Sequence, residues 1–521
     1  MHESTTPPGP PRARPTDPPP TLPAVSIVVA VIAGLALTAA FPPLAQGWLA
    51  FPAIAAFQWS VLRARRPGVA ALAGVAFGLT FVGLLVPWLR NVAGAAYIGF
   101  VAAHLPYFAA YGWVVNRTRH WPLPTRALVM AAGWVAVFFV LRWQPVLAIE
   151  WADPGYTVAP LALARNAAAL WGATGWGVVI AVVATGVTLA ATERSRTAAL
   201  VAAAALVVAF GAGLVVDHWP AGEPVEVAVV QGHPPCPGFP CASTREQITV
   251  NHLRLTSTVA PGPDLVVWAE SSVGFTTDPA QNPAVQDAIV EQARRLDAHM
   301  LIGADRPAGD ANFVNANLMF DQEGRIVGEY RKQHGVPFGE YVPWRPVFGR
   351  LALLSRVPRD MIPGSGPVVL SLDGNAIGSV ISFEAAFGRY AREHAALGAG
   401  LLVVNTNQSS YGRGSASDQI IAMTTMRASE LGLDLVHAAI TGRSTLIAGG
   451  VPGPRTPLYE DAILAGTLTL RDAPPTPYAR FGDWLVTVLL VVAAAATMQH
   501  LVVSLTANRP PPSAEVDAVE A

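Results

Sequence analysis

The chain has 521 residues, of which 52% are hydrophobic and only 13% are charged, and its formal net charge is −1. It is too long for one ordinary domain, and its balance of apolar to charged residues departs far from that of a soluble protein. The near-zero net charge, with no basic stripe in the sequence, excludes a nucleic-acid-binding surface. These features predict an integral membrane protein that carries a soluble insert.

Eight apolar runs predict membrane-spanning helices, because most contain the roughly 17–25 residues that cross a hydrocarbon core about 30 Å thick. We expect about seven helices in residues 22–216, one more in 482–506, and a soluble domain in 217–481 between them. The proline-rich residues 1–21 and 507–521 are expected to be disordered tails. The apolar runs are residues 22–40, 46–62, 69–88, 92–115, 125–141, 170–190, 198–216 and 484–505.

The distribution of arginines predicts how the bundle is oriented. Loops on one side carry most of the arginines, and by the positive-inside rule that side faces the cytoplasm. Both tails are therefore expected in the cytoplasm, and seven crossings place the soluble domain outside. The rich side holds Arg12, Arg14, Arg63, Arg65, Arg66, Arg117, Arg119, Arg126, Arg194 and Arg196, and the opposite side holds Arg90, Arg142 and Arg165.

The soluble domain alternates between predicted strands and helices, which indicates an α/β sheet layered with helices. In such sheets, reactive groups gather where strands end. The predicted strands are residues 223–231, 264–270, 300–303, 317–321, 325–330, 368–372, 376–383, 401–405, 435–440 and 444–448, and the predicted helices are residues 243–259, 283–296, 385–397 and 415–431.

Two cysteines, Cys236 and Cys241, lie in a proline-rich stretch of this domain. Outside the cytoplasm a disulfide between them is favoured. A metal site is disfavoured, because no His/Cys pair completes a tetrahedral set. A further hypothesis, that one of them supplies a reactive thiol from a mobile loop, is disfavoured by the short proline-rich spacing.

The chain contains a single lysine, Lys332, and all its other basic residues are arginines. An ammonium is a compact charge that can be desolvated beside a reacting atom, whereas a guanidinium is a planar fork that cannot lose its proton. Lys332 follows one predicted strand, Glu270 ends another, and Ser382 lies at the end of a third. Together they predict a site built from an acid, a lysine and a nucleophile.

Five motifs carry a resemblance to a known family. They are Trp268-Ala-Glu270-Ser, the block Arg331-Lys332-Gln-His-Gly-Val-Pro-Phe-Gly-Glu340-Tyr-Val-Pro343, Ile381-Ser382-Phe383-Glu384, Asn405-Thr-Asn407 with Tyr411-Gly412, and Met426-Arg427-Ala-Ser-Glu430-Leu-Gly432. These stretches resemble the apolipoprotein N-acyltransferases, which are membrane-embedded members of the nitrilase (carbon–nitrogen hydrolase) superfamily. The resemblance implies a multi-pass protein of the bacterial cell membrane, with eight membrane helices, an inserted αββα domain and no cofactor.

The resemblance also implies a two-step acyl transfer. An acyl chain passes from a membrane phospholipid to an enzyme nucleophile, and then to the α-amino group of a diacylglyceryl-modified apolipoprotein cysteine. By resemblance, Glu270 is the general base, Lys332 stabilises the oxyanion, and Glu340 and Glu384 support the site. These roles agree with what such a reaction requires of a base and of a fixed positive charge.

The chain departs from the family at the centre of this site. The family nucleophile is a cysteine, and Ser382 occupies its position; Phe383 replaces the usual tyrosine, and a tryptophan expected near Cys236 is missing. Three hypotheses follow: an acyltransferase that uses Ser382 through an oxoester, a degenerate membrane scaffold for another envelope enzyme such as a polyprenol-phosphate mannosyltransferase, or a different acyl or amide reaction. A serine is usually activated by a histidine, and the position of His334, the histidine of the lysine block, cannot be derived from sequence.

Overall fold

The computed structural model describes residues 22–144, 150–216, 219, 221–233, 245–350, 354–355, 357–472 and 474–507. Of the expected tails, residues 1–21 and 508–521 lie outside these ranges, whereas Ala507 is the last residue of the final helix. So do Cys236 and Cys241, with their expected disulfide, and the stretch from which the family tryptophan is missing.

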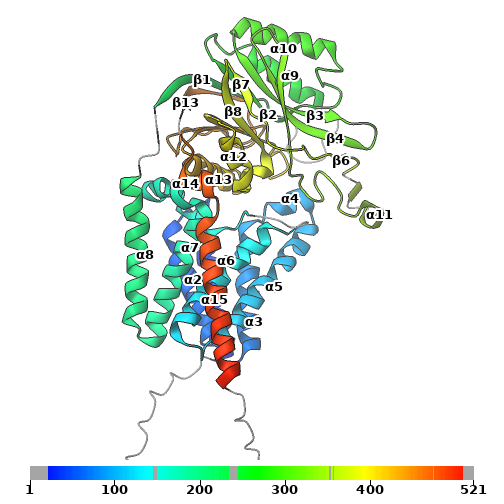
Figure 1. Ribbon diagram of the computed structural model, residues 1–521. Coiled ribbons are helices and arrows are strands. Elements are labelled where there is room, and N and C mark those ends of the chain that lie inside the picture. The colour runs from blue at the N-terminus through cyan, green and yellow to red at the C-terminus, as the bar shows by residue number, and fades with distance from the viewer. Residues whose placement is uncertain are drawn as a thin grey trace, which may run out of the picture.

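A bundle of long apolar helices forms one half of the molecule (Figure 1). In the described residues, seven helices are long and apolar enough to cross a membrane. The expected span at residues 46–62 is shorter: a 3₁₀ turn, η1 (Gly47–Leu49), leads into the 13-residue helix α2 (Ala50–Leu62). The seven long helices are α1 (Pro23–Ala40), α3 (Pro67–Leu85), α5 (Ala96–Arg117), α6 (Leu123–Arg142), α7 (Ala162–Glu193), α8 (Arg196–Val215) and α15 (Trp484–Ala507).

Glycines interrupt two of the expected spans. The run predicted at 92–115 is divided into the short helix α4 (Leu89–Ala93) and α5, because Gly94 has a φ of 55°. The run predicted at 170–190 is the second part of α7, which begins at Ala162 and is kinked at Gly172. A left-handed φ costs glycine little, so both breaks lie where the chain can turn without strain.

Two sheets stack face to face in the other half of the molecule (Figure 1). The first has the order β13-β1-β2-β3-β4-β5, with β6 paired to β4, and the second has the order β12-β11-β10-β9-β8-β7. The strands of the first sheet are β1 (Gly222–Gln231), β2 (Leu265–Val273), β3 (His299–Pro307), β4 (Asn312–Phe320), β5 (Ile326–Arg331), β6 (Asp360–Met361) and β13 (Ala462–Arg471), and those of the second are β7 (Leu370–Leu372), β8 (Asn375–Ile381), β9 (Leu401–Thr406), β10 (Asp434–Ala439), β11 (Thr445–Ala448) and β12 (Val451–Pro452).

Helices cover the outer face of each sheet, which gives four layers. One core lies between the two sheets. It contains Val227 and Leu265 of the first sheet and Leu401 and Val403 of the second. The helices α9 (Arg245–Thr256) and α10 (Pro283–Leu296) cover the first sheet. The helices α12 (Gly388–Ala396) and α13 (Ala416–Leu431) cover the second. Since α12 and α13 share one core with the membrane helices, the second sheet is the one nearer the bundle.

Buried polar groups connect this helical layer to α7. The N–H of Ala173 donates to Glu430 of α13 at 2.6 Å, and Glu430 also pairs with Arg427 at 2.7 Å. The donor at Ala173 is free only because the helix is broken at the preceding residue, Gly172. The kink in α7 therefore provides the backbone donor that binds the α/β domain.

The kink at Gly172 gives a first test of this architecture. Gly172 has φ 69° and ψ −178°, and an added Cβ would lie 2.4 Å from the ring of Tyr478. This backbone region is almost restricted to glycine and costs other residues roughly 1–3 kcal/mol. We expect Gly172→Ala to lower the Tm in detergent, and Gly211→Ala, where a Cβ meets open space, to leave it unchanged. Equal Tm values for both variants and the parent would contradict this account.

Candidate active site

Glu270 lies inside β2 rather than at its end, so the expectation from sequence is wrong on this point. The strand continues to Val273, but its regular pairing with β3 stops at Trp268 and resumes only at Val273. Ser271, between them, has a left-handed φ of 60°. Such an irregularity bends a strand and redirects its side chains, and bulges of this kind are common next to active sites.

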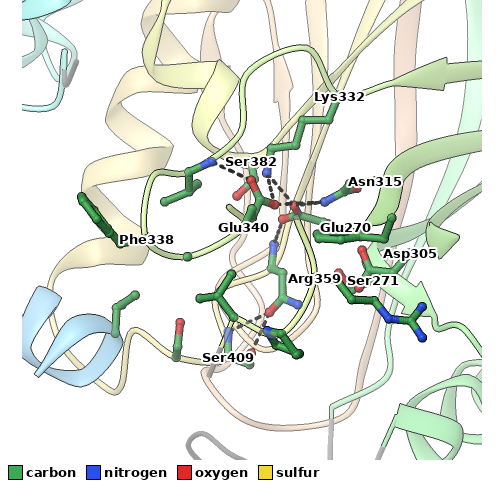
Figure 2. Close-up of a pocket in the computed structure, with 18 of the residues that line it drawn as sticks. Glu270, Ser271, Asp305, Asn315, Lys332, Phe338, Glu340, Arg359, Ser382 and Ser409 are labelled. Atoms are coloured by element: carbon green, nitrogen blue, oxygen red, sulfur yellow. Dashed lines mark hydrogen bonds and ion pairs between the residues drawn. The ribbon is translucent and has the colours of Figure 1, made fainter. Parts of the chain in front are cut away.

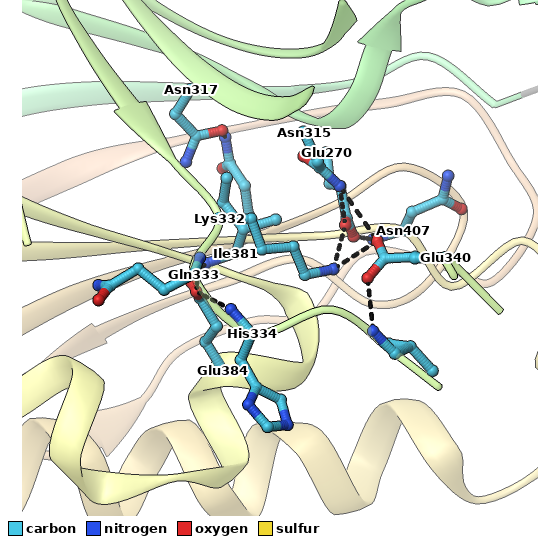
Figure 3. Close-up of polar contacts among 12 residues, drawn as sticks. Glu270, Asn315, Asn317, Lys332, Gln333, His334, Glu340, Ile381, Glu384 and Asn407 are labelled. Carbon is cyan, nitrogen blue, oxygen red and sulfur yellow. Dashed lines mark hydrogen bonds and ion pairs between the residues drawn. The ribbon is translucent and has the colours of Figure 1, made fainter. Parts of the chain in front are cut away.

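Lys332, which follows β5, places its ammonium between two carboxylates (Figures 2 and 3). Its Nζ atom lies 3.0 Å from Oε1 of Glu270 and 2.7 Å from Oε1 of Glu340. The Lys332 side chain is 1% exposed and that of Glu270 is 3% exposed. Two carboxylates thus share one buried cation, and the group carries a formal charge of −1.

Amide groups fix the orientation of both carboxylates (Figure 3). The side chain of Asn315 on β4 donates to Glu270 at 2.7 Å and to Glu340 at 3.3 Å. The N–H of Asn407, after β9, donates to the second oxygen of Glu270 at 2.5 Å, and the N–H of Val336 donates to Glu340 at 2.8 Å. The acid–lysine group is therefore held by contacts from four separate segments of the chain.

The pKa values of Glu270 and Lys332 are both raised above their ordinary values. Burial raises the pKa of Glu270, and the nearby Lys332 ammonium only partly offsets that increase. Burial alone would lower the pKa of Lys332, but the charges of Glu270 and Glu340 outweigh it and raise that pKa above its ordinary value. Lys332 therefore stays positive, while Glu270 is a stronger proton acceptor than an exposed carboxylate.

Ser382 lines the same cavity as this group. The cavity has a volume of about 280 Å³ and is bordered by Glu270, Lys332, Glu340 and Ser382. Ser382 follows β8, which ends at Ile381, and opens the 3₁₀ turn η5 (Ser382–Ala386). The rest of the cavity wall is largely apolar and includes Val92, Phe275, Phe313, Phe338, Leu354 and Val357.

Three cavity residues have strained backbones. Ser271, Phe338 and Ser382 have φ values of 60°, 61° and 54°, although none is a glycine. Left-handed non-glycine residues cost about 1–3 kcal/mol each and cluster at active sites and ligand clamps. Their occurrence around one cavity supports this cavity as the candidate active site.

Glu384 does not line this cavity, contrary to what a direct supporting role would require. Its carboxylate is fully buried and accepts from the N–H groups of Gln333, His334 and Ile381 at 2.6, 3.1 and 2.8 Å, and from the Tyr330 hydroxyl at 2.9 Å. Burial raises its pKa to about 7, against the effect of these donors. Glu384 thus joins the segment that carries Lys332 to the turn that carries Ser382.

The ring of His334 points away from Lys332 and Glu340 (Figure 3). It packs against Phe383 and Phe387 and does not border the cavity. Its Nδ1 atom lies 3.1 Å from the Tyr390 hydroxyl. Burial, with smaller effects of Arg389 and Lys332, lowers its pKa to about 4. The question left open by the sequence is therefore answered: His334 is not in position to act as a base for Ser382.

Asn315, Asn407 and Tyr411 all border the cavity, although no role was predicted for them. Asn407 and Tyr411 lie in one of the motifs that carry the family resemblance. For Asn315, the sequence itself contains one indication of a role. The predicted strand began at residue 317, whereas β4 begins at Asn312, so two asparagines, 315 and 317, lie within an apolar strand. Buried amides in such a position need partners. No comparable signal exists for the backbone N–H of Asn407.

The variant Glu384→Gln tests how much the hydrogen bonds of Glu384 contribute to stability. A carboxylate accepts all four donors, but a glutamine amide must turn its NH₂ group towards some of them. Each buried donor left without a partner costs about 1–3 kcal/mol, so we expect a clear fall in Tm measured in detergent. The control Glu291→Gln, on the exposed face of α10, should leave Tm unaltered. If the Glu384→Gln protein has the same Tm as the parent, the hydrogen bonds of Glu384 do not contribute to stability.

Comparisons with known proteins cover both halves of the chain. Residues 33–186 match the family described as "Apolipoprotein N-acyltransferase N-terminal domain", and residues 226–451 match "Carbon-nitrogen hydrolase". Two solved structures are also similar. An amidase of the nitrilase superfamily from Nesterenkonia sp. AN1 is 18% identical with a TM-score of 0.35 and covers 50% of this chain and 95% of its own. A carbon-nitrogen hydrolase from Helicobacter pylori G27 is 16% identical with a TM-score of 0.37, and the match covers 49% of this chain and 91% of the hydrolase.

Curated relatives named apolipoprotein N-acyltransferase match nearly the whole chain. The protein from Geobacter metallireducens is 29% identical over 512 residues, which is 92% of this chain and 96% of the relative. The protein from Mycolicibacterium smegmatis is 30% identical over 509 residues, which is 90% of this chain and 84% of the relative. With this similarity, its membrane bundle and its nitrilase-like domain, the chain belongs to the apolipoprotein N-acyltransferase family.

Proposed function

We propose that this protein is an apolipoprotein N-acyltransferase that uses Ser382 as its nucleophile. The observation that carries the proposal is the intact group of Glu270, Lys332 and Glu340 around the cavity that Ser382 also lines. The apolar wall of this cavity suits an acyl chain, and Val92 of α4 brings the membrane half of the molecule to its edge. The donor is a membrane phospholipid, and the acceptor is the α-amino group of a diacylglyceryl-cysteine.

In the first half-reaction, Oγ of Ser382 attacks the carbonyl carbon of a phospholipid ester. The hydroxyl proton passes to the carboxylate of Glu270, and the carbonyl oxygen becomes an oxyanion beside the Lys332 ammonium. The carbon–oxygen bond to the glycerol then breaks, and the glycerol oxygen takes the proton from Glu270. A lysophospholipid leaves, and the acyl chain remains on Ser382 as an oxoester.

In the second half-reaction, the α-amino nitrogen of the acceptor attacks the oxoester carbonyl. Lys332 again faces the oxyanion, and Glu270 takes a proton from the nitrogen. The carbon–oxygen bond to Ser382 breaks, and Oγ recovers its proton from Glu270. The products are the N-acylated lipoprotein and the free hydroxyl of Ser382.

An oxygen nucleophile demands more of its base than a thiol does. An alkyl hydroxyl has a pKa near the roughly 15.7 of water, against about 8.5 for a thiol, and each unit costs about 1.36 kcal/mol of proton transfer. The raised pKa of Glu270 reduces this mismatch. The buried ammonium of Lys332 reduces it further, because a fixed positive charge stabilises the developing negative charge.

We place the α/β domain on the extracytoplasmic side of the bacterial membrane. The support is the excess of arginine in alternate loops, which predicts a cytoplasmic N-terminus. No feature of the described residues or of the relatives favours the alternative of a scaffold for an envelope glycosyltransferase. The acyltransferase is therefore the function we adopt.

Acyl-enzyme formation tests the function directly. Purified protein in detergent, given phospholipid with a labelled acyl chain, should acquire label on the peptide that contains Ser382, as an ester that resists neutral hydroxylamine. Ser382→Ala should take up no label. Ser382→Cys should be labelled faster than the parent, because the thiol is the more acidic nucleophile, and its thioester should be labile to hydroxylamine.

The pattern of labelling separates the hypotheses. If the folded parent and the folded Ser382→Cys variant both take up no acyl chain, the proposed function is wrong, and the scaffold and a different acyl or amide reaction are the remaining hypotheses. If only Ser382→Cys is labelled, the cavity accepts the acyl donor, but the hydroxyl of Ser382 does not attack it. Transfer of the label onward to a synthetic diacylglyceryl-cysteine peptide identifies the acceptor.

The sidedness is tested by reporter fusions in cells. A reporter that is active only outside the cytoplasm should report activity when fused after Val216 and none when fused after Leu505. The reason is the odd number of crossings before the α/β domain, which are six long helices and the shorter helix α2. A cytoplasmic signal from the first fusion would overturn both the orientation and the access to lipoprotein substrates that it provides.

A further inference from the structure

Arg359 is a second cation at the wall of the active-site cavity. Among the described residues that line the cavity, the acids are Glu270, Asp305 and Glu340, and the bases are Lys332 and Arg359. The ammonium of Lys332 is already paired with two of these carboxylates, and the reaction requires it at the oxyanion. The guanidinium of Arg359 has no task in the acyl transfer itself.

The backbone of Arg359 is held in place by the residue that follows it. Asp360 belongs to β6, which pairs with β4, and its N–H donates to the carbonyl of Ala311 at 3.0 Å. The carboxylate of Asp360 accepts from the guanidinium of Arg345 at 2.6 and 2.5 Å. The acid next to Arg359 in the sequence is therefore paired with another arginine, and it does not neutralise the charge of Arg359.

The guanidinium of Arg359 lies over an aromatic ring. Its Cζ atom is 4.6 Å from the centroid of the Phe275 ring, and Arg359 is partly exposed. Figure 2 shows Arg359 on the side of the cavity where Ser271 and Asp305 lie, well apart from the ammonium of Lys332. A guanidinium that stacks by its flat face keeps its N–H donors at its edge, where two of them can bind one phosphate.

We propose that Arg359 binds the phosphate of the phospholipid donor and thereby selects phospholipids over neutral acylglycerols. This inference rests on the proposed function. A phosphodiester anion that enters the cavity meets three acids, and an anion that loses water without a cationic partner is costly to bury. Arg359 supplies that partner, while Lys332 keeps its place between Glu270 and Glu340.

The charges of the two substrates favour the donor as the ligand of Arg359. The acceptor reacts through an amine, which is cationic until it loses a proton and is then repelled by a guanidinium. The donor carries its phosphate anion on the same glycerol as the ester that Ser382 attacks. Two cations at separate places in one cavity fit such a ligand, because one faces the reacting ester and the other faces the phosphate.

Lipid binding tests this role without turnover. In the Ser382→Ala background, which cannot be acylated, the protein in detergent is titrated with a short-chain phospholipid that has a fluorescent acyl chain, and in parallel with the diacylglycerol of the same chains. Arg359→Met keeps an apolar side chain beside Phe275 and removes the charge. We expect the variant to bind the phospholipid about 10- to 100-fold more weakly and the diacylglycerol within about threefold of the Ser382→Ala protein.

Two further variants separate a phosphate contact from a general effect of charge or of folding. Arg359→Lys keeps the charge but loses the planar fork, so it should recover part of the affinity for phospholipid. Arg350→Met removes an exposed arginine that does not border the cavity, and it should leave both affinities unchanged. Equal weakening of both lipids by Arg359→Met, or the same loss from Arg350→Met, would mean that the inference is wrong.

Acylation of the parent protein separates this inference from the proposed function. If phospholipid does not acylate Ser382, but Arg359→Met weakens phospholipid binding as expected, the phosphate site stands and the proposed function falls. If Ser382 is acylated and Arg359→Met binds phospholipid as tightly as its background, the function stands and the inference is overturned. It is also overturned if neither lipid binds, or if Arg359→Met changes only the concentration of diacylglyceryl-cysteine peptide that transfer requires.

Discussion

One buried ammonium holds the reaction centre together. Glu270 and Glu340 lie on either side of Lys332, and without the cation two carboxylates would repel each other in a region from which water is largely excluded. Taking such ions out of water costs several kcal/mol each, and only close pairing with further hydrogen bonds offsets that cost. Asn315 and the N–H of Asn407 supply those bonds. This requirement explains why a chain that is otherwise rich in arginine has its one lysine here, since a planar guanidinium cannot act as a point charge between the two oxygens.

The membrane half of the molecule takes part in the site. Trp88 and Trp151 reach Gln419 and Tyr411, and Arg142 pairs with Asp483 at the start of α15. Domains that share only a polar, transient type of interface are expected to move against each other, but here a continuous apolar core joins the bundle to α12 and α13. The nucleophile and the lipid-facing helices are therefore parts of one packed unit, which suits an enzyme whose donor comes from the bilayer.

Much of this arrangement follows from the sequence, because periodicity and hydropathy are local properties. The long helices, the alternation of strands and helices, and the motifs with Glu270, Lys332 and Ser382 all lie close to where the sequence indicated. The kink at Gly172, the bulge after Trp268 and the inward turn of Tyr411 could not be predicted. Each depends on a partner more than a hundred residues away or on the register between strands. Glu384 was assigned from its neighbour Ser382, yet its carboxylate serves the Lys332 segment through four donors.

The backbone and surroundings of Ser382 differ from what the simple loss of a catalytic thiol would leave. Its left-handed backbone, with a φ of 54°, costs about 1–3 kcal/mol, and strain of this kind is concentrated at active sites. Burial also raises the pKa of Glu270, which makes its carboxylate a better acceptor for a hydroxyl proton. A thiol needs less help from its base, because its pKa is about 8.5 against the roughly 15.7 of a water-like hydroxyl. The strained backbone of Ser382 and the raised pKa of Glu270 are the physical arguments for the serine nucleophile that we propose.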